Sequence, residues 1–238
     1  GLTPLITPNA EFFRIDMAFS VPNVDLNAWR LKIKGKVRTP LSFSYEELLA
    51  MKQVEAPVTL ACVSNRVGDN LIGTAVWRGV ELRTLLDRAG VDPAGEQVLG
   101  ISVDGFTAGF PTAAAFDGRS ALVAIGMNGV PLPRENGFPA RLIVEGLYGY
   151  VSSTKWLDSI QLTGWNEVNG YWIDQGWAKN GPIKLSSRID VPQEETKPAE
   201  GIVTIAGVAW APNSGVSQVD VQINCEWNKA ELGDSISG

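Results

Sequence analysis

The segment from residue 59 to residue 66 places a thiol, an amide and a guanidinium directly after a strand-like apolar run. The thiolate of Cys62 is a soft ligand that suits a redox metal. The guanidinium of Arg66 has the planar shape that holds an oxyanion through two parallel hydrogen bonds. A lone cysteine at the end of an apolar strand is, however, more often a small buried hydrophobic residue than a ligand. The rest of the sequence therefore decides between a metal site and a core position.

The composition limits the chemistry that this chain can perform unaided. It contains no histidine, which removes serine triads, cysteine–histidine dyads, zinc sites with imidazole ligands and bis-histidine haem. It also lacks the Gly-x-Gly-x-x-Gly fingerprint of dinucleotide binding and the phosphate loop that ends in Gly-Lys-Ser/Thr. We therefore expect any catalytic activity to depend on a bound cofactor.

Length and charge are typical of a soluble globular chain. It has 238 residues, 45% of them hydrophobic, enough for one large or two modest domains. The net charge of -6 argues against nucleic acid or an anionic membrane surface as the main partner. No apolar run approaches the roughly 18 residues that span a bilayer. Residues 1–4 lack the features of a signal peptide, so we expect a chain trimmed at its start. Cys62 and Cys225 lie far apart and do not suggest a disulfide framework.

Three local patterns precede Cys62 and predict the elements that position it. Residues 28–37 alternate apolar and charged side chains with the period of a strand that has one solvated face. A capping-box pattern at Ser44 and Glu47 predicts a short helix directly after it. Residues 57–62 then form a short apolar run, which predicts a buried strand with the thiol at its end.

Downstream, the pattern mixes helices and strands. Residues 81–89 place three leucines on one helical face and stop at Gly90, which can take the left-handed conformation that closes a helix. Residues 97–103 and 121–127 predict further strands, and an Asn-Gly pair after the second predicts a tight hairpin turn. Because these elements do not alternate strictly, we predict an α+β fold.

The C-terminal part of the chain differs in composition. Residues 188–200 are rich in proline and glutamate and predict a linker. Residues 202–208 and 219–223 then predict short strands of a β-sandwich. We therefore predict two domains, residues 1–187 and residues 188–238. The second is too short for a complete sandwich, which needs about 100 residues.

Several motifs in a fixed order resemble the sulfite oxidase family, molybdopterin-dependent oxidoreductases with an immunoglobulin-like dimerisation domain. The resemblance spans nearly the whole chain and rests on the cysteine loop and on residues 77–82, 128–141, 149–157 and 203–210. It implies a molybdenum atom held by molybdopterin and by the single thiolate of Cys62. It also implies a mixed α/β molybdopterin-binding domain, followed by a truncated immunoglobulin-like β-sandwich. The activity it implies is oxygen-atom transfer to or from a small oxyanion, with the redox chemistry supplied by the cofactor.

The resemblance assigns roles to individual residues. Arg14, which ends a Phe-Phe-Arg segment, and Arg66 would hold the anion, and two converging guanidiniums would favour a doubly charged one. The residues expected at the cofactor are Phe13, Cys62, Asn65, Asp104, Asn136, Arg141, Ser152, Ser153, Thr154 and Lys155.

Three of these residues have an ordinary structural alternative. Arg66 could form a surface salt bridge, Lys155 could be a solvated lysine at a strand end, and Asp104 lies in a common turn sequence.

Three departures from the family pattern argue against sulfite in particular. Asn136 stands where the family often has histidine, and Ile15-Asp16 replaces its Asn-His pair. Trp177 stands close to the place where sulfite oxidases carry an active-site tyrosine. These departures leave the cofactor assignment in place.

The chain also lacks a haem-attachment motif and a cysteine cluster for iron and sulfur. We therefore expect a small anionic substrate, an external electron acceptor such as a cytochrome, and a homodimer formed through the complete second domain. For the full-length protein we expect an extracytoplasmic or membrane-associated location. Two alternatives stay open: reduction of S-oxides, N-oxides or nitrate on the same cofactor, and a non-catalytic β-rich module for protein association.

Overall fold

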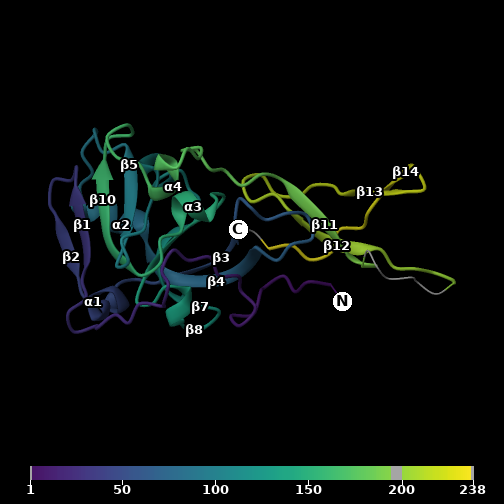
Figure 1. The fold of residues 1–238 in the computed structure, drawn as a ribbon, viewed down its shortest axis with the longest axis horizontal. Helices are drawn as coiled ribbons and strands as arrows, with labels where there is room; N and C mark the ends of the chain where they lie inside the picture. Colours follow the sequence, from purple (N-terminus) through teal and green to yellow (C-terminus); the bar gives the residue numbers. More distant parts are fainter. Residues whose placement is uncertain (1, 194–199, 237–238) are drawn as a thin grey trace.

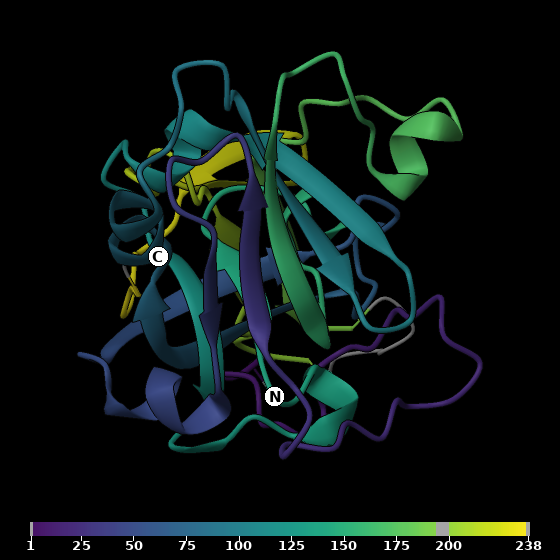
Figure 2. The same cartoon turned by 90° about the vertical axis from the view of Figure 1, so that its left-hand side faces the viewer.

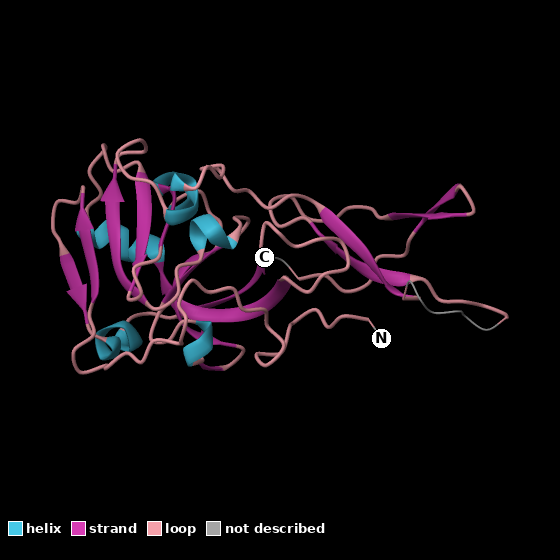
Figure 3. Ribbon diagram, in the orientation of Figure 1, coloured by secondary structure: helices cyan, strands magenta, loops and turns pink. Residues whose placement is uncertain are grey.

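The computed structural model describes residues 2–193 and 200–236, and its main body consists of two β-sheets with short helices around them (Figures 1 and 3). The first sheet has the strand order β2-β1-β10-β5-β6. Its members are β1 (Leu31–Gly35), β2 (Leu41–Phe43), β5 (Gln97–Ser102), β6 (Thr107–Pro111) and β10 (Leu157–Thr163). Strands β1 and β10 run parallel, whereas the other neighbours are antiparallel. Figure 2 looks onto this sheet.

The second sheet contains the strand that leads to Cys62. Its order is β3-β4-β7-β8, and β9 also pairs with β7. Its members are β3 (Val54–Ala61), β4 (Ile72–Glu81), β7 (Ala121–Met127), β8 (Val130–Pro131) and β9 (Arg141–Val144). All of these pairs are antiparallel. The mixed sheets and few helices confirm the predicted α+β class.

The locally encoded elements form where the sequence predicts them. Helix α1 (Tyr45–Ala50) begins after a complete capping box, in which the Glu47 N–H donates to Ser44 Oγ at 3.1 Å and the Ser44 N–H donates to the Glu47 carboxylate at 2.7 Å. Helix α2 (Leu82–Ala89) buries its leucines and ends at Gly90, whose φ is 68°. The predicted hairpin turn joins β7 to β8.

The remaining helical segments are short. They are α3 (Gly149–Ser152), α4 (Tyr171–Asp174) and two 3-10 turns, Thr112–Ala115 and Arg134–Asn136. Within residues 2–193 and 200–236, no helix has the length and apolar character needed to cross a membrane.

Two hydrophobic clusters fill the body, and β7 lies between them. Val123 and Ile125 face the larger cluster, which joins the first sheet to α1 and α2, whereas Leu122 and Ala124 face the smaller one. This is the alternation expected of a strand that is covered on both faces. The smaller cluster also contains Leu60 of β3, so the end of this strand packs against the hydrophobic core.

The C-terminal residues form an arm beside the body (Figure 1). The truncated immunoglobulin-like sandwich predicted for this part of the chain stays a prediction. Strand β11 (Ser186–Val191) pairs with β12 (Ala206–Trp210), and β13 (Asp220–Ile223) pairs with β14 (Glu226–Lys229). These are two separate two-stranded sheets.

The predicted linker is wrong at its start. Residues 188–191 belong to β11, because their backbone groups pair with β12, which composition alone does not reveal. Residues 194–199 of the predicted linker lie outside the described residues. The strand expected over residues 202–208 begins only at Ala206. The division into two domains stays a prediction.

Candidate cofactor and anion site

Cys62 lies directly after β3, at the start of a loop that returns to β4. Its N–H donates to the Leu71 carbonyl at 2.9 Å, and its Sγ lies 2.9 Å from Ser64 Oγ. The residue is half-buried and a free thiol, and it belongs to neither hydrophobic cluster. The alternative of a buried hydrophobic cysteine therefore does not describe this position.

Asn65 and Arg66 take different roles in the same loop. The Asn65 side chain accepts from the Leu71 N–H at 2.8 Å, so it closes the loop that presents Cys62. Arg66 is exposed, and its guanidinium forms no ion pair or hydrogen bond with the residues that the structure describes. The surface salt bridge considered for Arg66 is thus not formed within residues 2–193 and 200–236.

Helix α3 lies against the end of β3. A Cβ built on Gly149 would lie 3.8 Å from the Ala61 carbonyl oxygen and 3.6 Å from Ser153 Cβ. This close approach brings the segment that starts at Gly149 next to the residue that precedes Cys62. The Ser152 hydroxyl is already used, because it donates to the Tyr148 carbonyl at 3.0 Å.

Four predicted residues around this segment carry buried polar atoms that have no hydrogen-bond partner in the described part of the chain. The atoms are Ser153 Oγ, Thr154 Oγ1, Asn136 Oδ1 and Arg141 Nε. Buried polar groups in folded proteins are nearly always hydrogen-bonded, and leaving one unpaired costs about 1–3 kcal/mol. These atoms therefore fit a site for a polar ligand.

Arg141 is the least expected of these groups. Its side chain is buried, its Nη1 donates to the Asn136 carbonyl at 2.9 Å, and its guanidinium lies 5.0 Å from the centre of the Trp77 ring. No carboxylate among the described residues pairs with it. Burial lowers the pKa of Arg141 to about 9, so the group stays cationic at neutral pH.

The N-terminal segment brings Arg14 and Asp16 to this region. Phe12 is buried edge-on against Trp77, and Phe13 stacks on Phe12 with ring centres 5.3 Å apart. Phe13 is therefore a packing residue that fixes the chain just before Arg14. Arg14 Nη2 lies 3.6 Å from the Asp16 carboxylate.

Lys155 is a mostly buried residue rather than the solvated lysine considered above. Its side chain is 11% exposed, and its Nζ contacts Asp16 Oδ1, donates to the Glu135 carbonyl at 3.2 Å and lies 4.6 Å from the centre of the Trp156 ring. Desolvation, and secondarily the Arg14 charge, lower the pKa of Lys155 to about 7. The Asp16 carboxylate opposes this shift, because an adjacent opposite charge favours the ammonium.

Asp104 occupies the turn between β5 and β6. It is exposed, and its carboxylate accepts from the Phe106 N–H at 3.1 Å, as in an ordinary Asx turn. The turn nevertheless lies beside Trp156, because the Val103 N–H donates to the Trp156 carbonyl at 2.8 Å. A cofactor contact at Asp104 stays a prediction.

An aromatic row that the sequence analysis did not recognise lies around Trp177. Trp177 stacks on Trp172 with ring centres 4.5 Å apart and meets Tyr150 edge-on at 5.1 Å. The Tyr150 hydroxyl donates to the Ala178 carbonyl at 2.8 Å. The aromatic residues at positions 171, 172 and 177 could have indicated this row from the sequence. Trp177 is thus held by neighbouring rings, one of which is the phenol of Tyr150 in α3.

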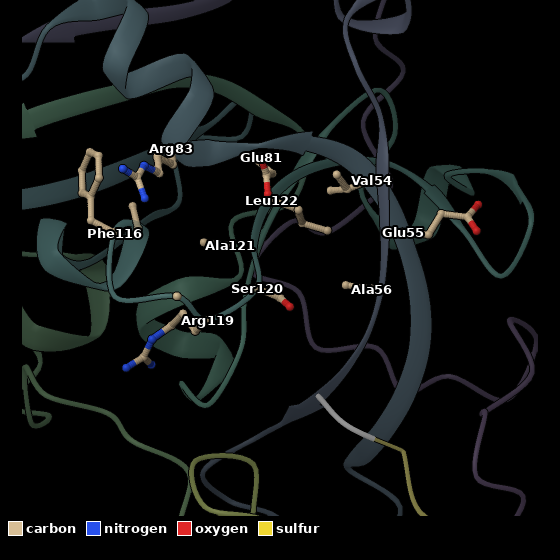
Figure 4. A pocket seen from close by; sticks show the side chains of 12 residues that line it. Val54, Glu55, Ala56, Glu81, Arg83, Phe116, Arg119, Ser120, Ala121 and Leu122 are labelled. Atoms are coloured by element: carbon tan, nitrogen blue, oxygen red, sulfur yellow. The ribbon is translucent and has the colours of Figure 1, made fainter.

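A surface hollow lies elsewhere. It has a volume of about 280 Å³ and lies between the start of β3, the end of β4 and the start of β7 (Figure 4). Glu81, Arg83 and Arg119 contribute to its lining, which includes none of the predicted site residues. The candidate site therefore rests on the position of Cys62 and on the polar groups around α3, and not on this hollow.

The donor set agrees with a molybdopterin group. A guanidinium, an ammonium, two hydroxyls and an amide lie on residues 136–155, and the part of this segment that starts at Gly149 packs against the residue before Cys62. Such groups match an anionic ligand rich in hydrogen-bonding atoms. Ser152 and Asn65 contribute by holding the backbone, because their side chains already have partners.

Comparison with known proteins identifies the class to which this fold and site belong. Residues 18–172 match the family of oxidoreductase molybdopterin-binding domains. The chain belongs to this family, that of the sulfite oxidases, as the sequence analysis predicted.

Individual relatives include enzymes of different named activities. Mitochondrial sulfite oxidase of Mus musculus is 30% identical in an alignment of 271 positions, gaps included. The alignment covers 95% of this chain and 49% of the relative. Nitrate reductase [NAD(P)H] of Hordeum vulgare is 34% identical over 179 residues, or 64% of this chain and 20% of the relative. The uncharacterized oxidoreductase YuiH of Bacillus subtilis is 33% identical over 159 residues, which cover 66% of this chain and 76% of the relative.

A solved structure has the same fold. The sulfane dehydrogenase SoxCD of Paracoccus pantotrophus superposes with a TM-score of 0.84 at 23% identity, over 99% of this chain and 67% of that one. The present chain spans about half the length of the mammalian sulfite oxidases that it matches.

Proposed function

We propose that this chain is the cofactor-binding part of a molybdenum oxidoreductase that transfers an oxygen atom to or from a small anion. The observation that carries the proposal is the accessible thiol of Cys62 beside buried, unpaired polar atoms in a domain of the molybdopterin-binding family. The named activities of the relatives make sulfite oxidation and nitrate reduction the first reactions to test.

Each part of the site has a role in this proposal. Cys62 would hold the metal, and Arg141, Asn136, Ser153 and Thr154 would supply hydrogen bonds to the pterin. When bound, the cofactor supplies the two-electron redox chemistry.

The chain's own cations would bind and orient the anion. Arg14 and Arg66 are exposed guanidiniums, so they can meet a ligand that arrives from solvent. Holding the anion in one orientation lowers the entropic part of the barrier, and fixed positive charge stabilises negative charge that remains on the product.

The proposed partners follow from the same chemistry. The sequence offers no histidine and only two cysteines for a further redox centre, so the electrons would pass to an external acceptor such as a cytochrome. We place the full-length protein outside the cytoplasm or at a membrane. A homodimer would form through the complete second domain.

Replacing each of the two cysteines by serine, in separate variants, tests the proposal. Protein made in a molybdenum-competent host should contain about one molybdenum per chain, because one thiolate and one pterin define one site. Cys62→Ser should lose the thiolate-to-molybdenum absorption and all turnover. Cys225→Ser, which alters an exposed free thiol on the arm, should retain both. An unchanged visible spectrum in Cys62→Ser would refute the ligand role.

A second candidate function is a non-catalytic module for protein association. The arm favours it, because it exposes large apolar side chains such as Ile202 and Trp227. Absence of molybdenum in the protein from a competent host would select this function. A kinetic screen of sulfite, nitrate and S-oxides would separate the catalytic options.

A further inference from the structure

Asp16 places a negative charge among the cations of the anion site. Its carboxylate bridges two of them, with Oδ2 3.6 Å from Arg14 Nη2 and Oδ1 in contact with Lys155 Nζ. The Asp16 side chain is 15% exposed, so water screens this charge only partly. The chain itself thus supplies the anion that these two cations hold.

The bridge changes the charge that the site offers to a substrate. Below the Lys155 pKa of about 7, Arg14 and Lys155 contribute two positive charges and Asp16 one negative charge, which leaves a net charge of +1. Above it, Lys155 is neutral, and the charges of Arg14 and Asp16 cancel. A doubly charged oxyanion would gain from the cations and at the same time be repelled by a partly buried carboxylate nearby. A substrate that is neutral or singly charged avoids most of this repulsion.

The same bridge occupies the donors that a dianion would need. The Lys155 ammonium already contacts Asp16 and the Glu135 carbonyl, and the Trp156 ring covers one side of it. Arg66 is the guanidinium of the site that has no partner among the described residues. Of the two exposed guanidiniums proposed to meet the anion, Arg66 is thus the one without a carboxylate partner, which matches a ligand with one negative charge.

We infer that Asp16 is a specificity-determining residue that selects neutral or singly charged substrates, such as S-oxides, N-oxides or nitrate, over doubly charged oxyanions. The inference rests on the proposed function and narrows its substrate class. It also corrects the expectation that Arg14 and Arg66 favour a dianion, since the carboxylate two residues after Arg14 removes much of that preference.

Sulfate binding to the purified holoenzyme tests the inference without turnover, because sulfate is a dianion that this site does not need to transform. Isothermal titration at low ionic strength would compare the wild type with Asp16→Asn, which keeps the size of the side chain and removes its charge. We expect Asp16→Asn to bind sulfate about tenfold more tightly, with a smaller gain at high salt because salt screens the interaction.

Two variants serve as controls. Asp16→Glu restores the charge and should bind sulfate as weakly as the wild type, which a merely structural role would not predict. Asp87→Asn makes the same chemical change in an exposed ion pair with Arg83 on α2 and should leave sulfate affinity unchanged. In turnover, Asp16→Asn should lower the KM for sulfite while the KM for dimethyl sulfoxide changes by less than about twofold.

The outcomes separate this inference from the proposed function. Equal sulfate affinity in the wild type and Asp16→Asn, or an equal gain in Asp87→Asn, would overturn the role of Asp16. The metal content measured on the same samples reports independently on the cofactor. Molybdenum with no sulfate effect would therefore remove Asp16 alone, whereas a sulfate effect without molybdenum would uphold the charge selection and remove the redox function.

Discussion

A buried guanidinium without a carboxylate partner is the residue-scale feature that most clearly separates a binding role from a structural one. Burying the Arg141 guanidinium destabilises the folded protein through desolvation. Among the described residues, only one hydrogen bond and the contact with the Trp77 ring offset this cost. A residue kept for stability would have a charged partner or be apolar, because well-packed hydrophobic side chains often replace buried charges at no loss. These features support the ligand-binding role that we propose for Arg141.

Replacement of this arginine gives opposite effects on stability and on cofactor retention. Arg141→Met should leave the cofactor-free protein unchanged or stabilise it by up to about 2 kcal/mol, because the desolvation cost disappears. Its molybdopterin content should fall strongly. Arg119→Met, which breaks an ion pair with Asp117 outside the site, should retain the cofactor. Thermal unfolding and pterin fluorescence measure the two quantities, and a large loss of stability in cofactor-free Arg141→Met would contradict the assignment.

The contact between Lys155 and Asp16 predicts a pH dependence of stability. Burial and Arg14 lower the pKa of Lys155 from 10.5 to about 7 in the folded state, and Asp16→Asn removes the carboxylate that opposes this shift. Between these two pKa values the unfolded lysine is protonated and the folded one is not. The unfolded state then binds more protons, so the free energy of unfolding rises as pH increases through this range.

Urea unfolding at about pH 6.5 and about pH 9.5 measures this effect. Asp16→Asn should gain more stability between the two pH values than the wild type gains. Addition of Lys155→Met should abolish the extra gain. Equal pH dependence in Asp16→Asn and the wild type would show that Asp16 does not influence the lysine.

At the scale of elements, the capping box before α1 offers a direct measurement of locally encoded stability. Ser44→Ala removes the hydroxyl that accepts from the Glu47 N–H, and should lower the free energy of unfolding by about 1 kcal/mol. Ser42→Ala, on the exposed side of β2, should change it by less than about 0.5 kcal/mol. Chemical denaturation gives both values, and equal effects would mean that the cap contributes nothing.

Elements that depend on neighbouring residues could be predicted from the sequence, whereas their assembly could not. The alternation around β1, the capping box of α1 and the leucine face of α2 involve contacts within a few residues, so local chemistry specifies them. The linker prediction failed at β11, because its pairing with β12 joins residues separated by an intervening segment.

The site shows the same limit. Motif spacing led to Cys62 and to Arg141, but it gave no sign that Asp16 would meet Lys155, 139 positions later in the chain. Nor did it show that the Ser152 hydroxyl is used within α3, whereas those of Ser153 and Thr154 are not. Such roles depend on tertiary contacts, which no periodicity in the sequence records.

At the scale of the whole molecule, the arm is joined to the site through Arg188 of β11. Its Nη1 donates to the Asp69 carbonyl at 2.9 Å, in the loop that begins at Cys62, and its Nη2 donates to Thr3 Oγ1 at 2.7 Å. Asp190 pairs with the same guanidinium at 2.8 Å. These contacts tie β11 of the arm to the loop that presents the thiol.

The exposed strands of the arm predict self-association of the chain. Every residue of β14 is exposed, Trp227 by 69%, and a two-stranded sheet is only marginally stable in water without a covering surface. A second copy of the arm would cover these apolar groups and pair with the open strand edges.

Trp227→Glu should therefore shift a concentration-dependent dimer towards monomer in sedimentation velocity experiments. Leu49→Glu, which adds the same charge at an exposed apolar position on α1, should not. A wild-type protein that stays monomeric at all concentrations would show that the arm does not bind a second copy of itself.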